Sequence, residues 1–499
     1  MSTLTLEPES CYRAVSARDP RFDGLFFTAV TTTGIYCRPM CPARTPARQS
    51  CRFFATAAAA ESAGFRPCLR CRPELAPGRP AYAAGLGEAV LARVQANAHR
   101  PEGIEALAFE IGLSSRQVRR ILREQFGVTP IQIIQTQRLL FAKKLLHETT
   151  LSMTQVALAA GFGSVRRFNA TFQKHYRLSP SQLRKQTVSR AGQTEGISLK
   201  LVFRAPLAFD AALSYLRTRA TPGVETVVGN TYWRTVRFPA AQTEFSGWIA
   251  VTSVAGQNHL TVRVPAHLAP VLLALTTRLR ALFDLDANPQ HIDTQLAADP
   301  ALARLVLATP GLRVIGAWDP FELALRAVLG QQISVAGATT LAGRMADRFG
   351  EEVDTPMAGL GRLAPKASRV ARCTLDDVAS IGLPRARAAT IIALARFADG
   401  GGLRFSHGVG LEDMVQSLAT VPGIGNWTAQ YIAMRAFCQP DAFPAGDLGL
   451  KRALPFLDGV KPGGDLPSER ALLARSEVWK PWRAYAAAHL WRSGAQPGP

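Results

Sequence analysis

Four cysteines in two close pairs place the strongest constraint on how this chain can fold. Three residues separate Cys37 from Cys41, two separate Cys68 from Cys71, and 26 lie between the pairs. Two such pairs joined by a loop are typical of a tetrahedral Zn2+ site, because each pair chelates from one turn. The surrounding 80 residues can build only a small core, so bound metal would supply much of the folding free energy. We predict one Zn2+ ion with four cysteine ligands.

The sequence carries no signal for secretion or for a membrane span. The first ten residues, MSTLTLEPES, lack a basic stretch followed by an apolar one, and no run of 18 apolar residues occurs. We therefore expect a soluble, cytoplasmic protein without membrane contact, in which disulfides are disfavoured. The cysteines outside the two pairs are expected to be ordinary buried thiols: Cys11, Cys51, Cys373 and Cys438.

An excess of basic side chains indicates a polyanionic partner. The 499 residues include 58 Lys and Arg but only 37 Asp and Glu, a net charge of +21. Residues 1–200 contribute 28 basic and 13 acidic side chains, so the excess is concentrated there. Neutralising phosphates releases condensed counterions, which favours binding to nucleic acid. Solubility, or an arginine-rich genome, is the alternative explanation of the charge.

Composition divides the chain into five parts, and we expect a multidomain protein that is mainly α with α+β parts. The predicted parts are a cysteine-rich domain (1–80), short amphipathic helices (81–186), a polar linker (187–196), an α+β domain (197–312) and an all-α domain (313–499). A Pro/Gly-rich stretch closes the first part, and β-branched runs at 199–203, 226–228 and 259–264 mark the strands of the fourth.

The residues around the cysteines resemble the N-terminal zinc domain of the Ada methylation-response family. The likeness covers residues 10–76 and is strongest at 26–41 and 63–73. In that family the first cysteine of the set accepts a methyl group from a DNA methylphosphotriester, so the resemblance implies that Cys37 is both a ligand and a methyl acceptor. Losing one thiolate charge would weaken repulsion of the DNA backbone and could act as a switch. Two further residues are expected near the DNA: Thr33 and Arg70. The alternative is a purely structural zinc site.

Residues 104–180 contain an internal repeat with an offset of 49 to 50 positions. Leu107-Ala108 before Gly112 is matched by Val156-Ala157 before Gly161. An alanine before a glycine-containing turn lets two helices cross closely, which is typical of a helix-turn-helix. Ser115 and Ser164 stand where they would cap the second helix of each copy.

The two copies, joined by a predicted helix over 131–147, resemble the AraC-type DNA-binding domain. In that family two recognition helices enter successive major-groove segments of duplex DNA. The resemblance implies promoter DNA as a partner and makes RNA polymerase a candidate partner. Arginines of the two predicted recognition helices are the expected DNA contacts, unless they are merely solvated: Arg116, Arg119, Arg120, Arg166 and Arg167.

The sequence Pro422-Gly423-Ile424-Gly425 lies between two amphipathic stretches and predicts a tight hairpin whose backbone N–H groups can hold phosphate oxygens. With the flanking stretches 321–334, 381–388 and 443–452, it resembles the helix-hairpin-helix DNA glycosylase superfamily. Within that superfamily, residues 197–499 are most similar to the AlkA alkylbase glycosylases. Residues expected at the DNA by this likeness are Gly423, Gly425, Thr428 and Gln331.

Asp447 is the expected catalytic carboxylate of this superfamily. Cleavage of an N-glycosidic bond leaves positive charge on the sugar, and a nearby carboxylate lowers that barrier or activates water. Asp447 also precedes a helical run, so it would otherwise be only an N-cap. Bifunctional members carry a nucleophilic lysine where this chain has Trp427, which cannot form a Schiff base. We therefore predict a monofunctional glycosylase without a cofactor for this step.

An alkylated purine such as 3-methyladenine carries positive charge, which favours stacking on electron-rich rings once the nucleotide is flipped out. The AlkA likeness places four aromatic residues in this pocket: Trp427, Trp491, Tyr431 and Tyr215. The chain departs from the family at Leu448-Gly449, which replaces an aromatic–Leu pair, and by one extra residue between Pro444 and Asp447.

Together these features predict a DNA alkylation-damage repair and response protein. It would excise alkylated bases, accept methyl groups at Cys37 and activate repair genes. Two alternatives remain open at this point: a transcriptional regulator that binds alkylated DNA without excising bases, and a glycosylase that its N-terminal half merely anchors to DNA.

Overall fold

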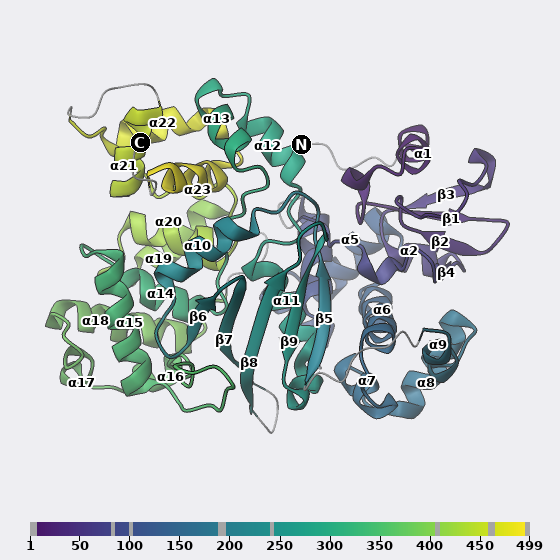
Figure 1. Cartoon of the computed structure of the whole chain (residues 1–499), viewed down its shortest axis with the longest axis horizontal. Coiled ribbons are helices and arrows are strands. Elements are labelled where there is room, and N and C mark those ends of the chain that lie inside the picture. The colour runs from purple at the N-terminus through teal and green to yellow at the C-terminus, as the bar shows by residue number, and fades with distance from the viewer. Residues whose placement is uncertain are drawn as a thin grey trace.

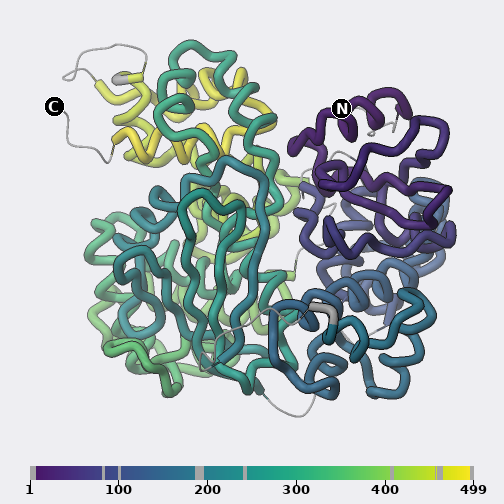
Figure 2. The backbone as a smooth tube through the Cα atoms, turned by 45° about the vertical axis from the view of Figure 1, so that its right-hand side comes forward, coloured from purple at the N-terminus to yellow at the C-terminus, as the bar shows by residue number. Residues whose placement is uncertain are grey.

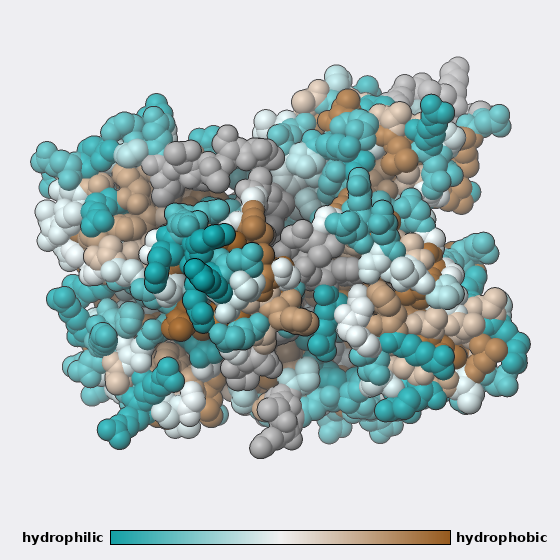
Figure 3. All heavy atoms as spheres, turned by 180° about the vertical axis from the view of Figure 1, so that it is seen from behind, coloured by the Kyte–Doolittle hydropathy of each residue, from teal (hydrophilic) through white to brown (hydrophobic). Residues whose placement is uncertain are grey.

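The computed structural model describes residues 7–80, 85–98, 103–187, 196–239, 244–404, 410–457 and 465–494. The N-terminal half lies beside the C-terminal half, and a five-stranded sheet lies between the N-terminal half and a large helical region (Figures 1 and 2). The face opposite to that of Figure 1 is largely hydrophilic, with hydrophobic residues in small separate groups (Figure 3). None of the described helices has the length and apolar composition needed to cross a bilayer. The expected architecture, mainly α with α+β parts, is confirmed.

The cysteine-rich region folds around a small sheet. Its elements are α1 (Pro8–Ser16), β1 (Phe27–Val30), β2 (Ile35–Cys37), β3 (Cys51–Phe54), α2 (Ala57–Ser62) and β4 (Arg66–Pro67), with 3-10 turns at Pro20–Phe22, Arg48–Ser50 and Pro73–Leu75. The strand order is β3-β1-β2-β4. β1 pairs antiparallel with β2 and β3, whereas β2 pairs parallel with β4. Parallel pairing brings the ends of β2 and β4, each followed by a cysteine pair, to the same edge.

The internal repeat forms two helix-turn-helix units, as predicted. The helices are α3 (Leu86–Ala96), α4 (Ile104–Glu110), α5 (Ser115–Phe126), α6 (Pro130–Glu148), α7 (Met153–Ala159), α8 (Val165–Tyr176) and α9 (Pro180–Thr187). The side chain of Ser164 caps α8, as expected, but α5 is capped by Ser114 and not by Ser115, which is its first helical residue. Gln117 completes a capping box with Ser114, and this reciprocal pairing fixes the start of α5 one residue earlier than predicted.

The predicted α+β region is an antiparallel sheet of order β5-β9-β8-β7-β6. Its elements are β5 (Ile197–Val202), α10 (Phe209–Arg219), β6 (Glu225–Val228), β7 (Thr231–Pro239), β8 (Glu244–Ser253), β9 (His259–Val264), the 3-10 helix η4 (Ala266–Val271) and α11 (Leu272–Leu282). The three β-branched runs identified in the sequence lie in β5, β6 and β9, so those predictions are confirmed.

The remaining chain is helical. Its helices are α12 (Pro289–Leu296), α13 (Pro300–Ala308), α14 (Pro320–Leu329), α15 (Val335–Phe349), α16 (Ala367–Val370), α17 (Leu375–Ala379), α18 (Arg385–Asp399), α19 (Leu411–Ala419), α20 (Asn426–Ala436), α21 (Leu448–Leu457), α22 (Glu469–Ser476), the 3-10 turn Glu477–Trp479 and α23 (Arg483–Gly494). One hydrophobic core unites them, with α14 packed against α18 and α20.

The second helix-turn-helix unit and the sheet share one hydrophobic core. Phe168 and Phe172 of α8 belong to the same cluster of buried side chains as Leu199 and Leu201 of β5. Helix α7 packs on η4, and α6 packs on β5. Most of the predicted linker over 187–196 lies outside the described residues, but the packing on either side of it is continuous.

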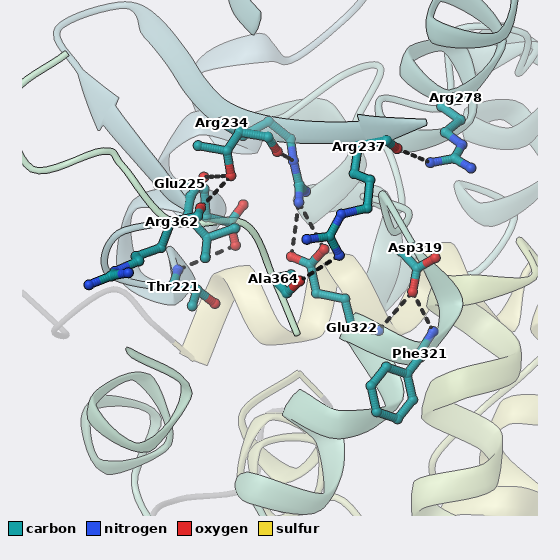
Figure 4. Close-up of polar contacts among 12 residues, drawn as sticks. Thr221, Glu225, Arg234, Arg237, Arg278, Asp319, Phe321, Glu322, Arg362 and Ala364 are labelled. Atoms are coloured by element: carbon teal, nitrogen blue, oxygen red, sulfur yellow. Dashed lines mark hydrogen bonds and ion pairs between the residues drawn. The ribbon is translucent and has the colours of Figure 1, made fainter. Parts of the chain in front are cut away.

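A buried ion pair joins the sheet to the helical region (Figure 4). Arg234 of β7 donates through Nη2 to both carboxylate oxygens of Glu322 on α14, at 3.0 and 2.8 Å. The hydroxyl of Thr235 donates to the carbonyl of Arg362 at 2.6 Å. The ion pair fixes α14 against the sheet, the Thr235 hydrogen bond fixes the loop between α15 and α16, and α14 in turn packs against α20.

Candidate zinc centre and glycosylase site

The two cysteine pairs meet at one edge of the small sheet. Cys37 ends β2, and Cys68 directly follows β4, where its N–H donates to the carbonyl of Tyr36 at 3.0 Å. The Sγ atoms of Cys37, Cys41, Cys68 and Cys71 all lie within 4.8 Å of one another. A tetrahedral site with Zn–S bonds of about 2.3 Å requires sulfurs about 3.8 Å apart. The donor set therefore fits one Zn2+ ion, as predicted.

The four sulfurs differ in their access to solvent. Cys68 and Cys71 are each 8% exposed, whereas Cys37 and Cys41 are half-buried. The backbone N–H of Arg38 donates to Sγ of Cys71 at 3.4 Å. The more accessible pair therefore contains Cys37, the predicted methyl acceptor.

Ion pairs lock the zinc centre to the rest of the chain. Nε of Arg38, which follows Cys37 directly, donates to the carboxylate of Asp23 at 2.9 Å. The backbone carbonyl of Asp23 accepts a hydrogen bond of 2.8 Å from Arg204, which follows β5 in the C-terminal half. On another side, Lys143 of α6 is fully buried and donates to Glu74 at 2.7 Å and to the carbonyl of Cys68 at 3.1 Å. Both the helix-turn-helix region and the sheet thus contact the zinc domain through buried charges.

The residues predicted to contact DNA in the N-terminal half are exposed. Thr33 lies in the β1–β2 turn and Arg70 between Cys68 and Cys71. The arginines of the recognition helices α5 and α8 are also exposed: Arg116, Arg119, Arg120, Arg166 and Arg167. Arg119 shares an exposed ion pair of 3.1 Å with Glu105. Of the remaining cysteines, Cys11 and Cys51 are buried as expected, but Cys373 is only half-buried and Cys438 is exposed, because it lies in the loop that follows α20.

The predicted hairpin connects α19 to α20. Gly423 has a positive φ of 87°, and a Cβ there would lie 2.1 Å from Oγ1 of Thr390, so only glycine fits. Gly425 is the N-cap residue of α20, which leaves the first N–H groups of that helix open to a ligand. Gln331 donates through Nε2 to the carbonyl of Gly423 at 3.0 Å and to the buried hydroxyl of Thr428 at 3.1 Å. The two hydrogen bonds of Gln331 therefore hold the hairpin in place at Gly423 and at Thr428.

Asp447 lies half-buried before α21, between two indole rings. Nε1 of Trp491 donates to Oδ1 at 2.8 Å, and Nε1 of Trp427 donates to Oδ2 at 3.2 Å. Oδ1 also accepts from the backbone N–H of Leu450 at 3.0 Å, so Asp447 caps α21 as well. These donors are neutral N–H groups, and no cation of the described residues forms an ion pair with this carboxylate. Such a group can stabilise a cation that develops beside it.

The four predicted pocket aromatics form a continuous wall. Trp427 and Tyr431 are stacked, with ring centroids 5.6 Å apart and an interplanar angle of 12°. Tyr431 meets Trp491 edge to face at 6.1 Å, and its hydroxyl lies 3.1 Å from that of Tyr215 on α10. The wall therefore combines side chains from both the sheet region and the helical region.

Two further residues lie at this site: Gly449, which the sequence marked only as a departure from the family, and Arg435, which it did not identify. Gly449 lies against the carboxylate, since a Cβ there would be 2.9 Å from Oδ1 of Asp447 and 3.2 Å from Cδ1 of Trp491. A side chain at this position would crowd both groups, so glycine leaves room for the contact between Trp491 and Asp447. Arg435 of α20 is buried and donates to the hydroxyl of Tyr431 at 2.8 Å. Its position one helical turn after Tyr431 is the only sequence signal for it.

Comparison with known proteins finds matches to four parts of the chain, in the order expected from the sequence. Family models match for the metal binding domain of Ada over residues 10–74, a helix-turn-helix domain over 107–186, the AlkA N-terminal domain over 198–319, and the HhH-GPD superfamily of base excision DNA repair proteins over 325–482.

Two relatives and one solved structure are similar to the chain. A probable bifunctional transcriptional activator/DNA repair enzyme AlkA of Mycobacterium tuberculosis is 38% identical over 498 residues, covering 98% of this chain and 97% of the relative. DNA-3-methyladenine glycosylase 2 of Escherichia coli is 34% identical over 298 residues, covering 60% of this chain and 98% of the relative. The structure of a 3-methyladenine DNA-glycosylase from Archaeoglobus fulgidus has a similar fold, with a TM-score of 0.51, 20% identity, and coverage of 59% of this chain and 97% of that one.

The fold and the two sites define a DNA-binding repair protein in which an Ada-type zinc domain and a helix-turn-helix domain precede a helix-hairpin-helix glycosylase fold. The chain belongs to the family of bifunctional transcriptional activator/DNA repair enzymes AlkA, as its identity over nearly the whole length shows.

Proposed function

We propose that this protein hydrolyses the N-glycosidic bond of alkylated DNA bases, of which 3-methyladenine is the type. The proposal rests on one observation above all: a carboxylate held by two indole N–H groups within an aromatic wall, beside the hairpin. Asp447 stabilises positive charge on the sugar as the bond to the base breaks, and Trp427, Trp491, Tyr431 and Tyr215 form the pocket for the flipped base. Hairpin N–H groups at Gly423 and Gly425 hold the DNA backbone.

Trp427 occupies the position of the nucleophilic lysine of bifunctional members. Because Trp427 cannot form a Schiff base, the enzyme leaves the abasic site uncut. The test is a base-release assay on duplex DNA treated with a methylating agent, read for both base release and strand cutting. We expect free 3-methyladenine without strand cutting before alkali is added. Failure to release any methylated base would contradict the proposal.

The N-terminal half accepts methyl groups from DNA methylphosphotriesters at Cys37. The zinc ion, when bound, keeps the sulfurs ionised at neutral pH and so makes them nucleophilic. Cys37 is favoured because it lies in the more accessible of the two pairs. Intact-mass and peptide analysis after exposure to methylphosphotriester DNA should locate one added methyl group on Cys37. Unmodified Cys37 under these conditions would leave the zinc centre with a structural role only.

The helix-turn-helix region binds promoter DNA and directs transcription of repair genes, with RNA polymerase as the partner and the cytoplasm as the compartment. Its exposed arginines on α5 and α8 are the contacts to DNA, together with Thr33 and Arg70 of the zinc domain. Footprinting before and after methylation of Cys37 tests this role, and we expect tighter binding after methylation because the site has lost one negative charge.

A further inference from the structure

The two oxygens of the Asp447 carboxylate are held unequally. Oδ1 accepts two hydrogen bonds, from Nε1 of Trp491 at 2.8 Å and from the backbone N–H of Leu450 at 3.0 Å. Within the described part of the chain, Oδ2 accepts only one, from Nε1 of Trp427 at the longer distance of 3.2 Å. Each oxygen of an ionised carboxylate can accept about two hydrogen bonds. Oδ1 is therefore fully occupied, and Oδ2 keeps one free position.

The two donors to Oδ1 come from different helices. Leu450 lies in the first turn of α21, which Asp447 caps, and Trp491 lies on α23, which packs against α21. The capping bond alone would leave the carboxylate plane free to turn, whereas a second bond from a neighbouring helix fixes it. Gly449 adds crowding on the same side, because a Cβ there would lie 2.9 Å from Oδ1. The carboxylate is thus held through Oδ1 alone of its two oxygens.

A second capping aspartate in this chain accepts from an indole, but it is also paired with a cation. Asp299 caps α13 through the N–H of Ala301 at 3.0 Å and accepts from Nε1 of Trp479 at 2.6 Å. Its third donor is Arg475, also at 2.6 Å. Among the residues that the structure describes, no cation pairs with Asp447 in this way. The same contact is therefore structural at Asp299, whereas at Asp447 it leaves the carboxylate available to a cation on the substrate.

We propose that Trp491 is a positioning residue for base excision: its indole N–H, together with the N–H of Leu450, holds Oδ1 so that Oδ2 faces C1′ of the flipped nucleotide. The inference rests on the glycosylase activity proposed above. The N–H of Trp491 serves the rate of bond cleavage through Asp447, whereas its ring lines the pocket. Gly449 is required for the same reason, since a Cβ there would press on both Asp447 and Trp491.

The step is balanced in atoms and charge. When the base is cationic, as in 7-methylguanine, the bond between the base nitrogen and C1′ breaks, and its electron pair stays on the base, which leaves as a neutral molecule. The positive charge passes to the sugar, where Oδ2 stabilises it. The oxygen of a water molecule forms the new bond to C1′, and one water proton is released to the solvent. Asp447 and Trp491 are unchanged at the end.

The test is single-turnover excision of 7-methylguanine from a duplex that carries one such base, measured over a range of enzyme concentrations. Trp491→Phe keeps an aromatic ring but removes the N–H. We expect the maximal rate to fall at least about tenfold, which is the effect of losing one hydrogen bond to a charged group. The enzyme concentration that gives half of this rate should change by less than about threefold, because the ring still lines the pocket.

Gly449→Ala disturbs the same contact without changing Trp491. Alanine favours a helix more than glycine does, which offsets the cost of crowding, so the melting temperature should stay close to the wild-type value. The maximal rate should nevertheless fall as it does in Trp491→Phe. Because both changes break one hydrogen bond, the double variant should be less than about twofold slower than the slower single variant.

Trp479→Phe is the matched control. It removes an indole N–H from Asp299, a capping aspartate outside the aromatic wall. The maximal rate and the half-saturating enzyme concentration should both stay at the wild-type values. Melting temperatures of all variants show that each is folded.

The outcomes separate the two proposals. If the wild type releases no 7-methylguanine, the glycosylase assignment fails. If the wild type is active but Trp491→Phe alters only the half-saturating concentration, or alters nothing, Trp491 is a wall residue and its positioning role is overturned. The role is also overturned if the losses of Gly449→Ala and Trp491→Phe multiply in the double variant, or if Trp479→Phe slows excision equally.

Discussion

The zinc-bearing half and the glycosylase site bury their carboxylates in opposite ways. Beside the zinc centre, Glu74 accepts from Lys143 at 2.7 Å and from Arg72 at 2.9 Å, so its charge is cancelled by two cations. At the glycosylase site, Asp447 accepts from two neutral indoles. Cancelled charges suit a region that must hold three domains together. A carboxylate held by neutral donors suits the role proposed for Asp447, which is to stabilise a cation on the substrate.

The same contrast appears in two further buried acids. Glu148, at the end of α6, pairs with Lys144 at 3.0 Å and with Arg72 at 3.3 Å. Asp284, in the C-terminal half, accepts instead from the hydroxyl of Tyr485. The acids beside the zinc centre are thus held by cations, whereas Asp447 and Asp284 accept from aromatic N–H and O–H groups.

Removal of zinc should have the largest effect, and it should be confined to the N-terminal half. Structural zinc contributes about 10–16 kcal/mol in small domains, far more than this small core supplies. We expect a chelator, or Cys68→Ser, to unfold residues 7–80, as seen by hydrogen exchange, and to abolish methyl acceptance. Base excision from short duplexes should persist. A parallel loss of excision would show that the ion pairs around Arg204 carry the disruption across to the C-terminal half.

Loss of a single cation beside the zinc centre should have the second-largest effect, which is a lower free energy of unfolding. Lys143→Met leaves Glu74 buried with only Arg72 to pair it, and breaking a buried pair costs about 3–5 kcal/mol. Urea unfolding measured by far-UV circular dichroism should show this loss. Lys185→Met, at an exposed lysine of α9, is the control and should cost less than about 0.5 kcal/mol. Similar losses in both variants would mean that the network around Glu74 contributes little.

Removing the charge of Asp447 at the candidate glycosylase site should slow base excision and leave the free energy of unfolding almost unchanged. Asp447→Asn keeps the size of the side chain but removes its charge, and we expect excision of 7-methylguanine to slow by about 10²–10³-fold or more. Asp413→Asn, at an exposed acid of α19, should retain the wild-type rate. An undiminished rate in Asp447→Asn would remove this residue from catalysis.

Features encoded over short stretches of sequence were predictable. The cysteine spacing predicted the zinc ligands, the internal repeat predicted both helix-turn-helix units, and Pro-Gly-x-Gly predicted the hairpin. Each of these features contains a turn of a few residues, which the local sequence specifies. Residues such as Asp447 and Trp427 required the family resemblance in addition, since nothing local distinguishes a catalytic aspartate from an N-cap. The structure shows Asp447 in contact with both tryptophans and capping α21, so these two interpretations are compatible.

Contacts between distant segments could not be predicted. Phe168 and Leu199 share a core although a polar stretch separates them, because apolar periodicity shows which face is buried but not against what. The need for glycine at position 449 depends on how closely Trp491 approaches Asp447. The position of Arg435 depends on its hydrogen bonds to phenols from two domains. For the same reason the exposure of Cys438 was predicted wrongly: a lone cysteine carries no local sign of its surroundings.

Asp284 and Glu74 should also make the free energy of unfolding respond to pH in opposite directions. Burial raises the pKa of the Asp284 carboxyl to about 7, although Arg313 and the hydrogen bond from Tyr485 act against this. Its unfolded value is about 3.9, so its contribution to stability is complete below about pH 4 and is lost as the pH rises through 7. Glu74 behaves in the reverse sense. Burial alone would raise its pKa, but Lys143 and Arg72 lower it, so its contribution is lost as the pH falls below its usual range.

We therefore expect Asp284→Asn to flatten the pH dependence of the free energy of unfolding between pH 5 and 7. The wild type should lose at most about 3 kcal/mol over this interval through Asp284, because each pKa unit is worth about 1.4 kcal/mol. Glu74→Gln should leave this interval unchanged and alter the profile only at lower pH. Urea titrations at half-unit steps measure both. Parallel profiles for wild type and Asp284→Asn would show that Asp284 is ionised throughout this interval, and would remove its contrast with Glu74.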